Sequence, residues 1–171
     1  GLGDVYKRQS LGYDDYSTFL RIGSAGDYAR FTGVDQLTWW KKLVEHPAYD
    51  AFWQGQALDA VMAKTPLKVP TLWLQGLWDQ EDMWGANHAY QAMEGRDSGN
   101  DRNYLVMGPW RHSQVNYSAS ELGALKFDGD TALQFRRDVL KPFFDQYLVD
   151  GAPKADTPPV LIYNTGENHW D

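Results

Sequence analysis

Two short polar stretches carry side chains that could do acid–base chemistry. The first reads Trp78-Asp79-Gln80-Glu81-Asp82 and the second reads Gly108-Pro109-Trp110-Arg111-His112. A carboxylate that accepts a hydrogen bond from one imidazole nitrogen fixes the tautomer of the ring, so that the other nitrogen can act as a base. Asp79 and His112 are therefore candidates for the acid and the base of a nucleophilic triad.

The elements around these stretches predict that the two would meet. Residues 69–76 and 103–108 are short apolar runs bounded by Pro and Gly, which is typical of buried strands. Residues 83–94 and 132–149 have helical spacing, with Pro142 expected to bend the second helix. A strand–helix–strand–helix order predicts an α/β fold with a parallel sheet, in which sites collect at the carboxyl ends of the strands. These ends are residues 77–82 and 109–116.

The segments that flank this α/β region predict a helical subdomain before it and a linker and a β strand after it. Residues 36–45, with Asp35 as N-cap, and residues 48–63 are expected to form two helices of a helical subdomain. Residues 152–159 are typical of a linker, and residues 159–166 of a strand that would open a further β domain. Residues 1–9 lack periodicity, and we expect them to be a non-native scar.

Composition narrows the classes of partner. The 171 residues include 16 basic and 23 acidic side chains, a formal net charge of −7, and the pI is about 5.0. Such an acidic chain disfavours nucleic acid and anionic membrane surfaces as partners. No run approaches the length of a membrane span, and the absence of Cys excludes thiolate chemistry within this sequence.

Two longer motifs carry a family resemblance. Residues 73–82 read WLQGLWDQED, residues 107–112 read MGPWRH, and residues 46–53 read HPAYDAFW. Together they resemble the α-amino acid ester hydrolases, a branch of the cocaine esterase, glutaryl acylase and X-Pro dipeptidyl-peptidase class of serine hydrolases. The resemblance runs over about residues 11–171.

The resemblance implies roles for four residues. It matches Asp79 to the triad acid and His112 to the triad base, in the chain order of the α/β-hydrolase fold. It matches Glu81 and Asp82 to two members of a carboxylate cluster that holds the α-ammonium group of the substrate. It implies no cofactor and no metal.

The resemblance also implies a domain plan. Residues 10–66 would be a segment of the helical cap, residues 67–150 the C-terminal part of the α/β-hydrolase core, and residues 151–171 a linker with the first strand of a truncated jelly-roll domain. No Gly-x-Ser-x-Gly motif occurs in the sequence. The nucleophilic serine, an oxyanion Tyr and the third cluster carboxylate are therefore expected upstream, and this fragment is expected to be inactive by itself.

The implied activity is hydrolysis of α-amino acid esters, and of β-lactam amides, through an acyl-enzyme. The expected partners are small amino acid ester, amide or peptide substrates and, in a homo-oligomer, further copies of the chain. Export to the periplasm or the medium is implied by the resemblance alone.

Several alternatives stay open at this point. The X-Pro relatives favour peptide cleavage as a second activity. Asp79, Glu81, Asp82 and His112 could together ligate a divalent cation in a metal-dependent hydrolase. A noncatalytic interaction domain is a third possibility. In the simplest structural interpretation, Glu81 and Asp82 only cap the following helix, and His112 is only a solvated loop residue.

Overall fold

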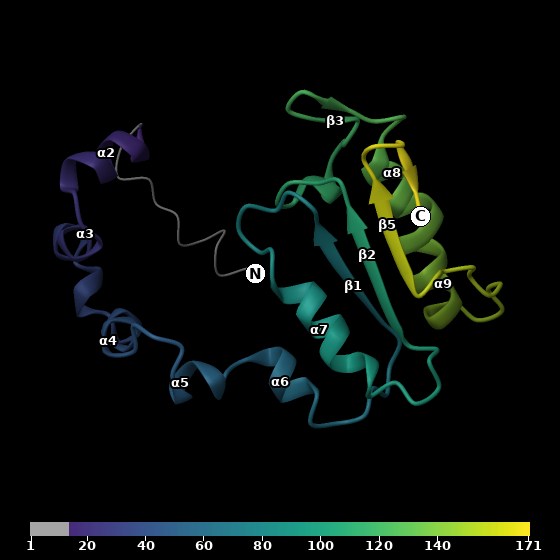
Figure 1. Ribbon diagram of the computed structural model, residues 1–171, viewed down its shortest axis with the longest axis horizontal. Helices are drawn as coiled ribbons and strands as arrows, with labels where there is room; N and C mark the ends of the chain where they lie inside the picture. Colours follow the sequence, from purple (N-terminus) through teal and green to yellow (C-terminus); the bar gives the residue numbers. More distant parts are fainter. Residues whose placement is uncertain (1–13) are drawn as a thin grey trace. The chain divides into compact units, whose positions relative to one another are not determined.

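The computed structural model describes residues 14–171. The expected scar at residues 1–9 lies outside the described residues. The chain divides into two compact units, residues 1–55 and residues 56–171 (Figure 1). Among the described helices, none is both long enough and apolar enough to cross a membrane.

The described part of the first unit is entirely helical. Capping side chains begin three of its helices: Asp14 accepts a hydrogen bond from Ser17 N, Ser24 from Asp27 N, and Asp50 from Phe52 N. The elements in chain order are α2 (Asp15–Ile22), α3 (Ala25–Thr32), the 3-10 turn η1 (Val34–Gln36), α4 (Thr38–Glu45) and α5 (Ala51–Gln54).

The two helices expected at residues 36–45 and 48–63 need correction. Asp35 lies inside η1 and is not the N-cap of α4, which begins at Thr38 after an extended Leu37. The second helix is two short ones, α5 and α6 (Leu58–Met62). Asp50 caps α5, which begins three residues later than expected, and α5 ends at Gln54, before Gly55, whose low helix propensity favours a break.

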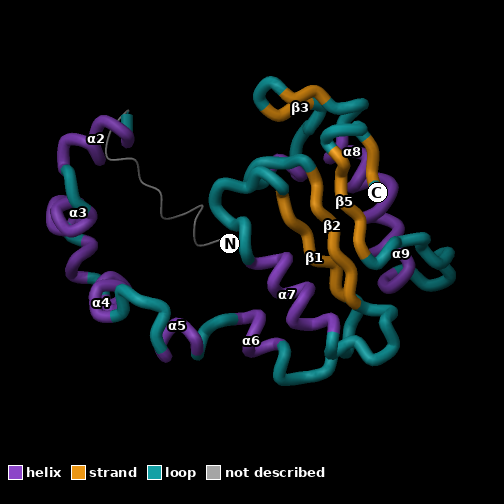
Figure 2. The backbone as a smooth tube through the Cα atoms, in the orientation of Figure 1, coloured by secondary structure: helices purple, strands orange, loops and turns teal. Residues whose placement is uncertain are grey.

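The second unit contains the expected parallel sheet. The four strands are β1 (Thr71–Gly76), β2 (Asn103–Gly108), β5 (Val160–Asn164) and β6 (His169–Trp170), in the order β1-β2-β5-β6 (Figures 1 and 2). Strands β1, β2 and β5 are parallel, and β6 returns antiparallel to β5. This confirms the mixed α/β class with a sheet rich in parallel pairs.

Helices cover the two faces of β2. On one face, Asn103 donates from its amide to Tyr90 O and to the Glu94 carboxylate of α7 (Gly85–Glu94), and it accepts a bond from the Trp73 indole. On the other face, Val106 is fully buried against Phe135 of α8 (Thr131–Phe135). Residues at odd and even positions of the strand thus fix different helices on opposite faces.

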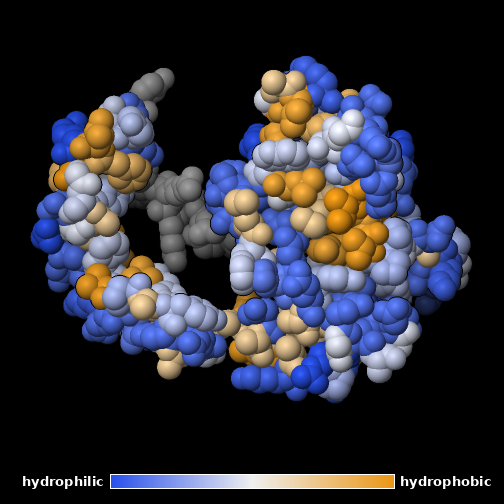
Figure 3. Space-filling model, in the orientation of Figure 1, coloured by the Kyte–Doolittle hydropathy of each residue, from blue (hydrophilic) through white to orange (hydrophobic). Residues whose placement is uncertain are grey.

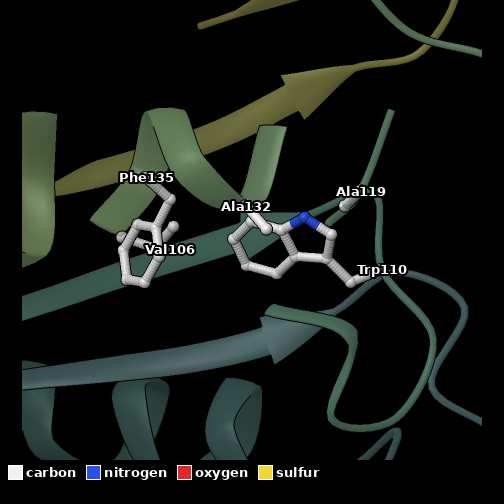
Figure 4. Packing of buried hydrophobic residues seen from close by; sticks show 5 residues of the cluster. All are labelled: Val106, Trp110, Ala119, Ala132 and Phe135. Atoms are coloured by element: carbon white, nitrogen blue, oxygen red, sulfur yellow. The ribbon is translucent and has the colours of Figure 1, made fainter. Parts of the chain in front are cut away.

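The core lies on the α8 side of the sheet. Its fully or almost fully buried members are Val106, Trp110, Ala119, Ala132 and Phe135 (Figure 4). The Trp110 ring lies 5.4 Å from the Phe135 ring and 5.8 Å from the Trp170 ring, centroid to centroid. Aromatic pairs at these distances stabilise the core beyond what the burial of their apolar surface contributes.

The long helix expected at residues 132–149 is present with a change of winding. It consists of α8, a π-helical stretch η3 at Arg136–Leu140, and α9 (Lys141–Leu148). Pro142 lies at the start of α9. The bend that Pro142 was expected to cause therefore takes the form of a wider turn just before it.

Residues 159–166, which were expected to open a jelly-roll domain, contain β5 of the main sheet. β5 pairs in parallel with β2, Val106 opposite Leu161, and so extends the main sheet instead of starting a separate one. The structure does not confirm a jelly-roll start. β5 leaves Val160 and Ile162 exposed by more than a third. Figure 3 shows an apolar surface over this sheet.

A small hairpin was not expected from the sequence. β3 (Glu121–Leu122) and β4 (Leu125–Lys126) pair antiparallel across a turn that includes Gly123 at φ 59°. The hairpin lies in the connection between β2 and α8. It follows the loop that carries His112.

Candidate active site at the carboxyl edge of the sheet

Backbone pairing continues past the ends of β1 and β2. Gly76 lies opposite Gly108 in the register of the two strands. Beyond them, Leu77 N donates to Gly108 O at 2.8 Å and Trp78 N donates to Trp110 O at 3.1 Å. The loops that follow the two strands are therefore held side by side.

Gly76 allows this close approach. A Cβ atom at this position would lie 2.5 Å from the carbonyl oxygen of Trp110, well inside van der Waals contact. The absence of a side chain lets the first loop reach the backbone of the second.

Asp79 is a nearly buried carboxylate, with 9% of its surface exposed. Its Oδ1 accepts hydrogen bonds from Glu81 N at 2.8 Å and from Asp82 N at 3.0 Å. Burial acts to raise the pKa of Asp79, but these two bonds and the one from His112 outweigh it, so that the pKa is lowered from its ordinary 3.8. Asp79 is therefore ionised at neutral pH.

His112 faces this carboxylate. Its Nδ1 lies 3.0 Å from Asp79 Oδ2 and 3.1 Å from Asp79 Oδ1, and its ring is 40% exposed. Because the carboxylate is ionised, Nδ1 carries the hydrogen and donates it. In the neutral ring Nε2 then holds the lone pair, as a general base requires.

Glu81 and Asp82 occupy different surroundings. Glu81 Oε2 lies 3.7 Å from His112 Nε2, on the outer side of the ring. Asp82 Oδ1 accepts a hydrogen bond from Gly85 N at 3.3 Å, at the first turn of α7. The structure thus brings Glu81 to the His112–Asp79 pair and places Asp82 at the start of a helix.

Two glutamines position the loops and were missed in the sequence. Gln80 Oε1 accepts a bond from His112 N at 3.3 Å, which joins the loops directly. Gln75, buried in β1, donates from its amide to Asp82 O. The signal for Gln75 was available, because an amide inside an apolar strand must find a partner. No sequence signal distinguishes Gln80 from other exposed polar residues.

The remaining histidines make local contacts. His46 Nδ1 lies 2.7 Å from Asp50 Oδ2, and its ring stacks on Phe52. The rings of His88 and Trp84 are stacked.

Residues 14–171 contain no cluster of ligands that would support the metal-dependent alternative. No group of three or more His, Asp or Glu side chains there is arranged to hold a metal ion. Asp79 and Asp82 instead accept bonds from backbone N–H groups.

Comparison with known proteins agrees with this architecture. The parallel sheet and its helices are those of part of an α/β-hydrolase-like enzyme. Residues 1–114 match the family described as X-Pro dipeptidyl-peptidase (S15 family), and the chain belongs to that family. No curated protein gives a significant match.

Two solved structures are similar over nearly the whole chain. An α-amino acid ester hydrolase labelled with selenomethionine is 77% identical with a TM-score of 0.88, over 95% of this chain and 26% of its own. An aminopeptidase from the marine sediment archaeon Thaumarchaeota archaeon is 46% identical with a TM-score of 0.87, over 96% of this chain and 27% of its own. The chain thus spans about a quarter of the length of these proteins. The resemblance to the α-amino acid ester hydrolases is confirmed.

Proposed function

We propose that the full-length protein is a serine hydrolase that cleaves α-amino acid esters through an acyl-enzyme, with β-lactam amides as a second substrate class. The observation that carries the proposal is the contact between His112 Nδ1 and the Asp79 carboxylate, 3.0 Å apart at the carboxyl edge of the sheet. The similarity to an α-amino acid ester hydrolase supports the choice of substrate.

In the proposed mechanism, His112 moves the protons and Asp79 holds His112 in place. Nε2 takes the proton of a seryl hydroxyl as the oxygen attacks the ester carbonyl, and returns it to the departing alcohol. In the second half, Nε2 takes a proton from water as the water oxygen attacks the acyl carbonyl, and returns it to the seryl oxygen as the acyl–oxygen bond breaks and the acid is released. The ionised Asp79 stabilises the imidazolium in both halves.

The seryl nucleophile would come from outside the 171 residues. The chain has no Gly-x-Ser-x-Gly motif, and it spans about a quarter of the length of its structural relatives. The 171 residues alone, which hold the proposed acid and base, would not turn over substrate.

Glu81 would bind the α-ammonium group of the substrate. Its carboxylate lies 3.7 Å from His112 Nε2, and in an α-amino acid ester the ammonium group is one carbon away from the carbonyl that reacts beside Nε2. Charge-assisted hydrogen bonds of this kind contribute about 1.5 to 3 kcal/mol each. We assign Asp82 a smaller part in binding the same ammonium group, because one of its oxygens already bonds to α7.

The second candidate is a peptidase that removes residues from a free N-terminus. The family to which the chain belongs is described as X-Pro dipeptidyl-peptidase, and one similar structure is an aminopeptidase. Such a peptide also carries an α-ammonium group, so the same carboxylates would serve. Comparing turnover of an α-amino acid methyl ester with turnover of an X-Pro dipeptide anilide separates the two.

Labelling with a fluorophosphonate tests the class of enzyme. The full-length protein should become covalently labelled on one serine, and the variant His112→Asn should react far more slowly because nothing removes the seryl proton. Equal labelling of both proteins would contradict the role of His112. Ester turnover that stops with a chelator and returns with added metal would instead support the metal-dependent alternative.

A further inference from the structure

The segment after His112 is held from one side by the helix that follows it. It consists of Ser113, with φ 62°, and the 3-10 turn η2 (Gln114–Asn116), and it continues through Tyr117 toward the hairpin. The turn is closed by local backbone bonds, Asn116 N to Ser113 O at 3.0 Å and Tyr117 N to Gln114 O at 2.9 Å. A segment this short, in which Ser113, Asn116 and Tyr117 are exposed, needs tertiary contacts to keep one conformation.

Arg136 provides two of these contacts from one atom. Its Nη1 donates to Val115 O and also to Tyr117 O, the second at 2.8 Å. The side chain is half-buried, and within residues 14–171 it makes no ion pair. The guanidinium is therefore committed to the carbonyls of the loop, and a charged donor makes such bonds stronger than neutral ones.

The winding of the helix changes at Arg136. It is the first residue of the π-helical stretch η3, between α8 and α9. Single π turns inside α-helices are uncommon and are frequent at functional sites. A second tether lies one turn earlier, where Thr131 Oγ1 accepts a bond from the Trp110 indole at 3.0 Å and donates to Ala119 O at 2.8 Å.

The neighbouring arginine makes no such contact. Arg137 is exposed and donates to the carboxylate of Asp138, the next residue, through Nε and Nη2, both at 2.6 Å. The two arginines thus share a chemical type and a helix, but only Arg136 reaches the loop. This pair offers a matched control.

We propose that Arg136 is a positioning residue, which holds the loop after His112 so that the imidazole keeps its orientation toward Asp79. The proposal deepens the proposed function and rests on it for its catalytic part. The contact itself predicts that the loop is ordered, and loop order can be measured without any substrate.

The first measurement is hydrogen–deuterium exchange in the full-length protein. Arg136→Met keeps most of the aliphatic side chain and removes every donor. Amides of residues 113–117 should exchange at least several-fold faster in this variant than in the parent, whereas Arg137→Met should leave them unchanged. Unchanged exchange in Arg136→Met overturns the proposal, whatever the enzyme's activity proves to be.

The second measurement is ester turnover. A displacement of about 1 Å in a catalytic group can lower the rate about a hundredfold, so we expect kcat to fall roughly ten- to a hundredfold in Arg136→Met. KM should stay nearly constant because the Arg136 guanidinium bonds to the loop carbonyls of Val115 and Tyr117. Arg136→Lys, which keeps the charge and N–H donors, should restore part of kcat, and Arg137→Met should match the parent.

Hydrogen exchange and kcat together distinguish a failure of the Arg136 proposal from a failure of the proposed function. Faster loop exchange with unchanged kcat would overturn the positioning role. An inactive parent protein with faster exchange in Arg136→Met would overturn the proposed function and leave the loop contact standing. If Arg136→Met does not fold, exchange and kcat of Arg136→Lys decide, and parent values in both would overturn the proposal.

Discussion

Asp79 shows how a nearly buried carboxyl group can stay ionised. Removal from water favours its neutral form, but two backbone N–H groups and an imidazole donate to its oxygens. The net effect lowers the pKa. The same bonds that orient the carboxylate thus also keep the charge that the His112 ring would need during a reaction.

The lowered pKa of Asp79 predicts a pH dependence of stability. The ionised group stabilises the folded state above its ordinary pKa of 3.8, and this contribution is lost as the pH falls through the lower folded-state pKa. The Tm difference between the parent and Asp79→Asn should therefore be constant near neutrality and shrink below about pH 4. Asp150→Asn, at an exposed carboxyl, serves as the reference. A difference that grows toward acid would contradict the assignment.

Glu81 and Asp82 should differ in their effect on substrates. Because Glu81 lies beside His112 Nε2, Glu81→Gln should lower kcat/KM for α-amino acid esters by about ten- to a hundredfold and leave esters without the amine nearly unchanged. Asp82→Asn should have the smaller effect. Parallel kinetics on the two ester types measure this. Equal losses on both types would remove the ammonium role.

Among single residues, the sequence predicted that Asp79 and His112 would meet, but it did not predict the residue that joins their loops. The meeting of Asp79 and His112 could be predicted, because parallel strands end at one edge of the sheet. Gln80 could not be predicted, since its partner is a backbone N–H 32 positions away that only the fold brings near. The catalytic role of the pair stays a prediction.

Individual elements were predictable where burial and local pattern agree. The bounds expected for β2, residues 103–108, are those of the structure, and β1 and α7 begin within two residues of the expected positions. These runs are apolar or periodic and are bounded by Gly or Pro. Tertiary packing and local propensity there favour the same structure.

Elements were missed where local signals compete. The helix expected over residues 48–63 is two helices, because the Asp50 cap and Gly55 override an apolar spacing that spans both. The π-helical turn before Pro142 depends on hydrogen bonds that periodicity does not report. The hairpin β3–β4 has two residues per strand, too few for an alternating pattern to show.

The close approach between the ends of β1 and β2 predicts that a methyl group added at Gly76 lowers the stability of the protein. Gly76→Ala would place a Cβ 2.5 Å from Trp110 O, so the loops must move apart. We expect a loss of about 1–3 kcal/mol of stability together with lower ester turnover. At Gly95, where a Cβ would meet nothing within 4 Å, the change to Ala should be neutral or stabilising. Denaturation curves of both variants check this, and a Gly76→Ala protein as stable as Gly95→Ala would contradict the close approach.

At the scale of the whole molecule, the chain would hold one edge of the proposed site. The described sheet has four strands, and the proposed acid and base follow two of them. The structural relatives are about four times longer than the chain. The proposed nucleophile would belong to that remaining length, so activity is a property to measure on the full-length protein.

The most direct test of the account is the ester turnover of the full-length protein with and without the Asp79 carboxylate. Replacing the acid of a Ser-His-Asp triad by its amide lowers kcat about 10⁴-fold in the serine protease example, through the wrong tautomer. We predict a loss of the same order in Asp79→Asn, in a protein that still folds at neutral pH. Turnover equal to that of the parent would contradict the assignment of Asp79 and His112 as acid and base.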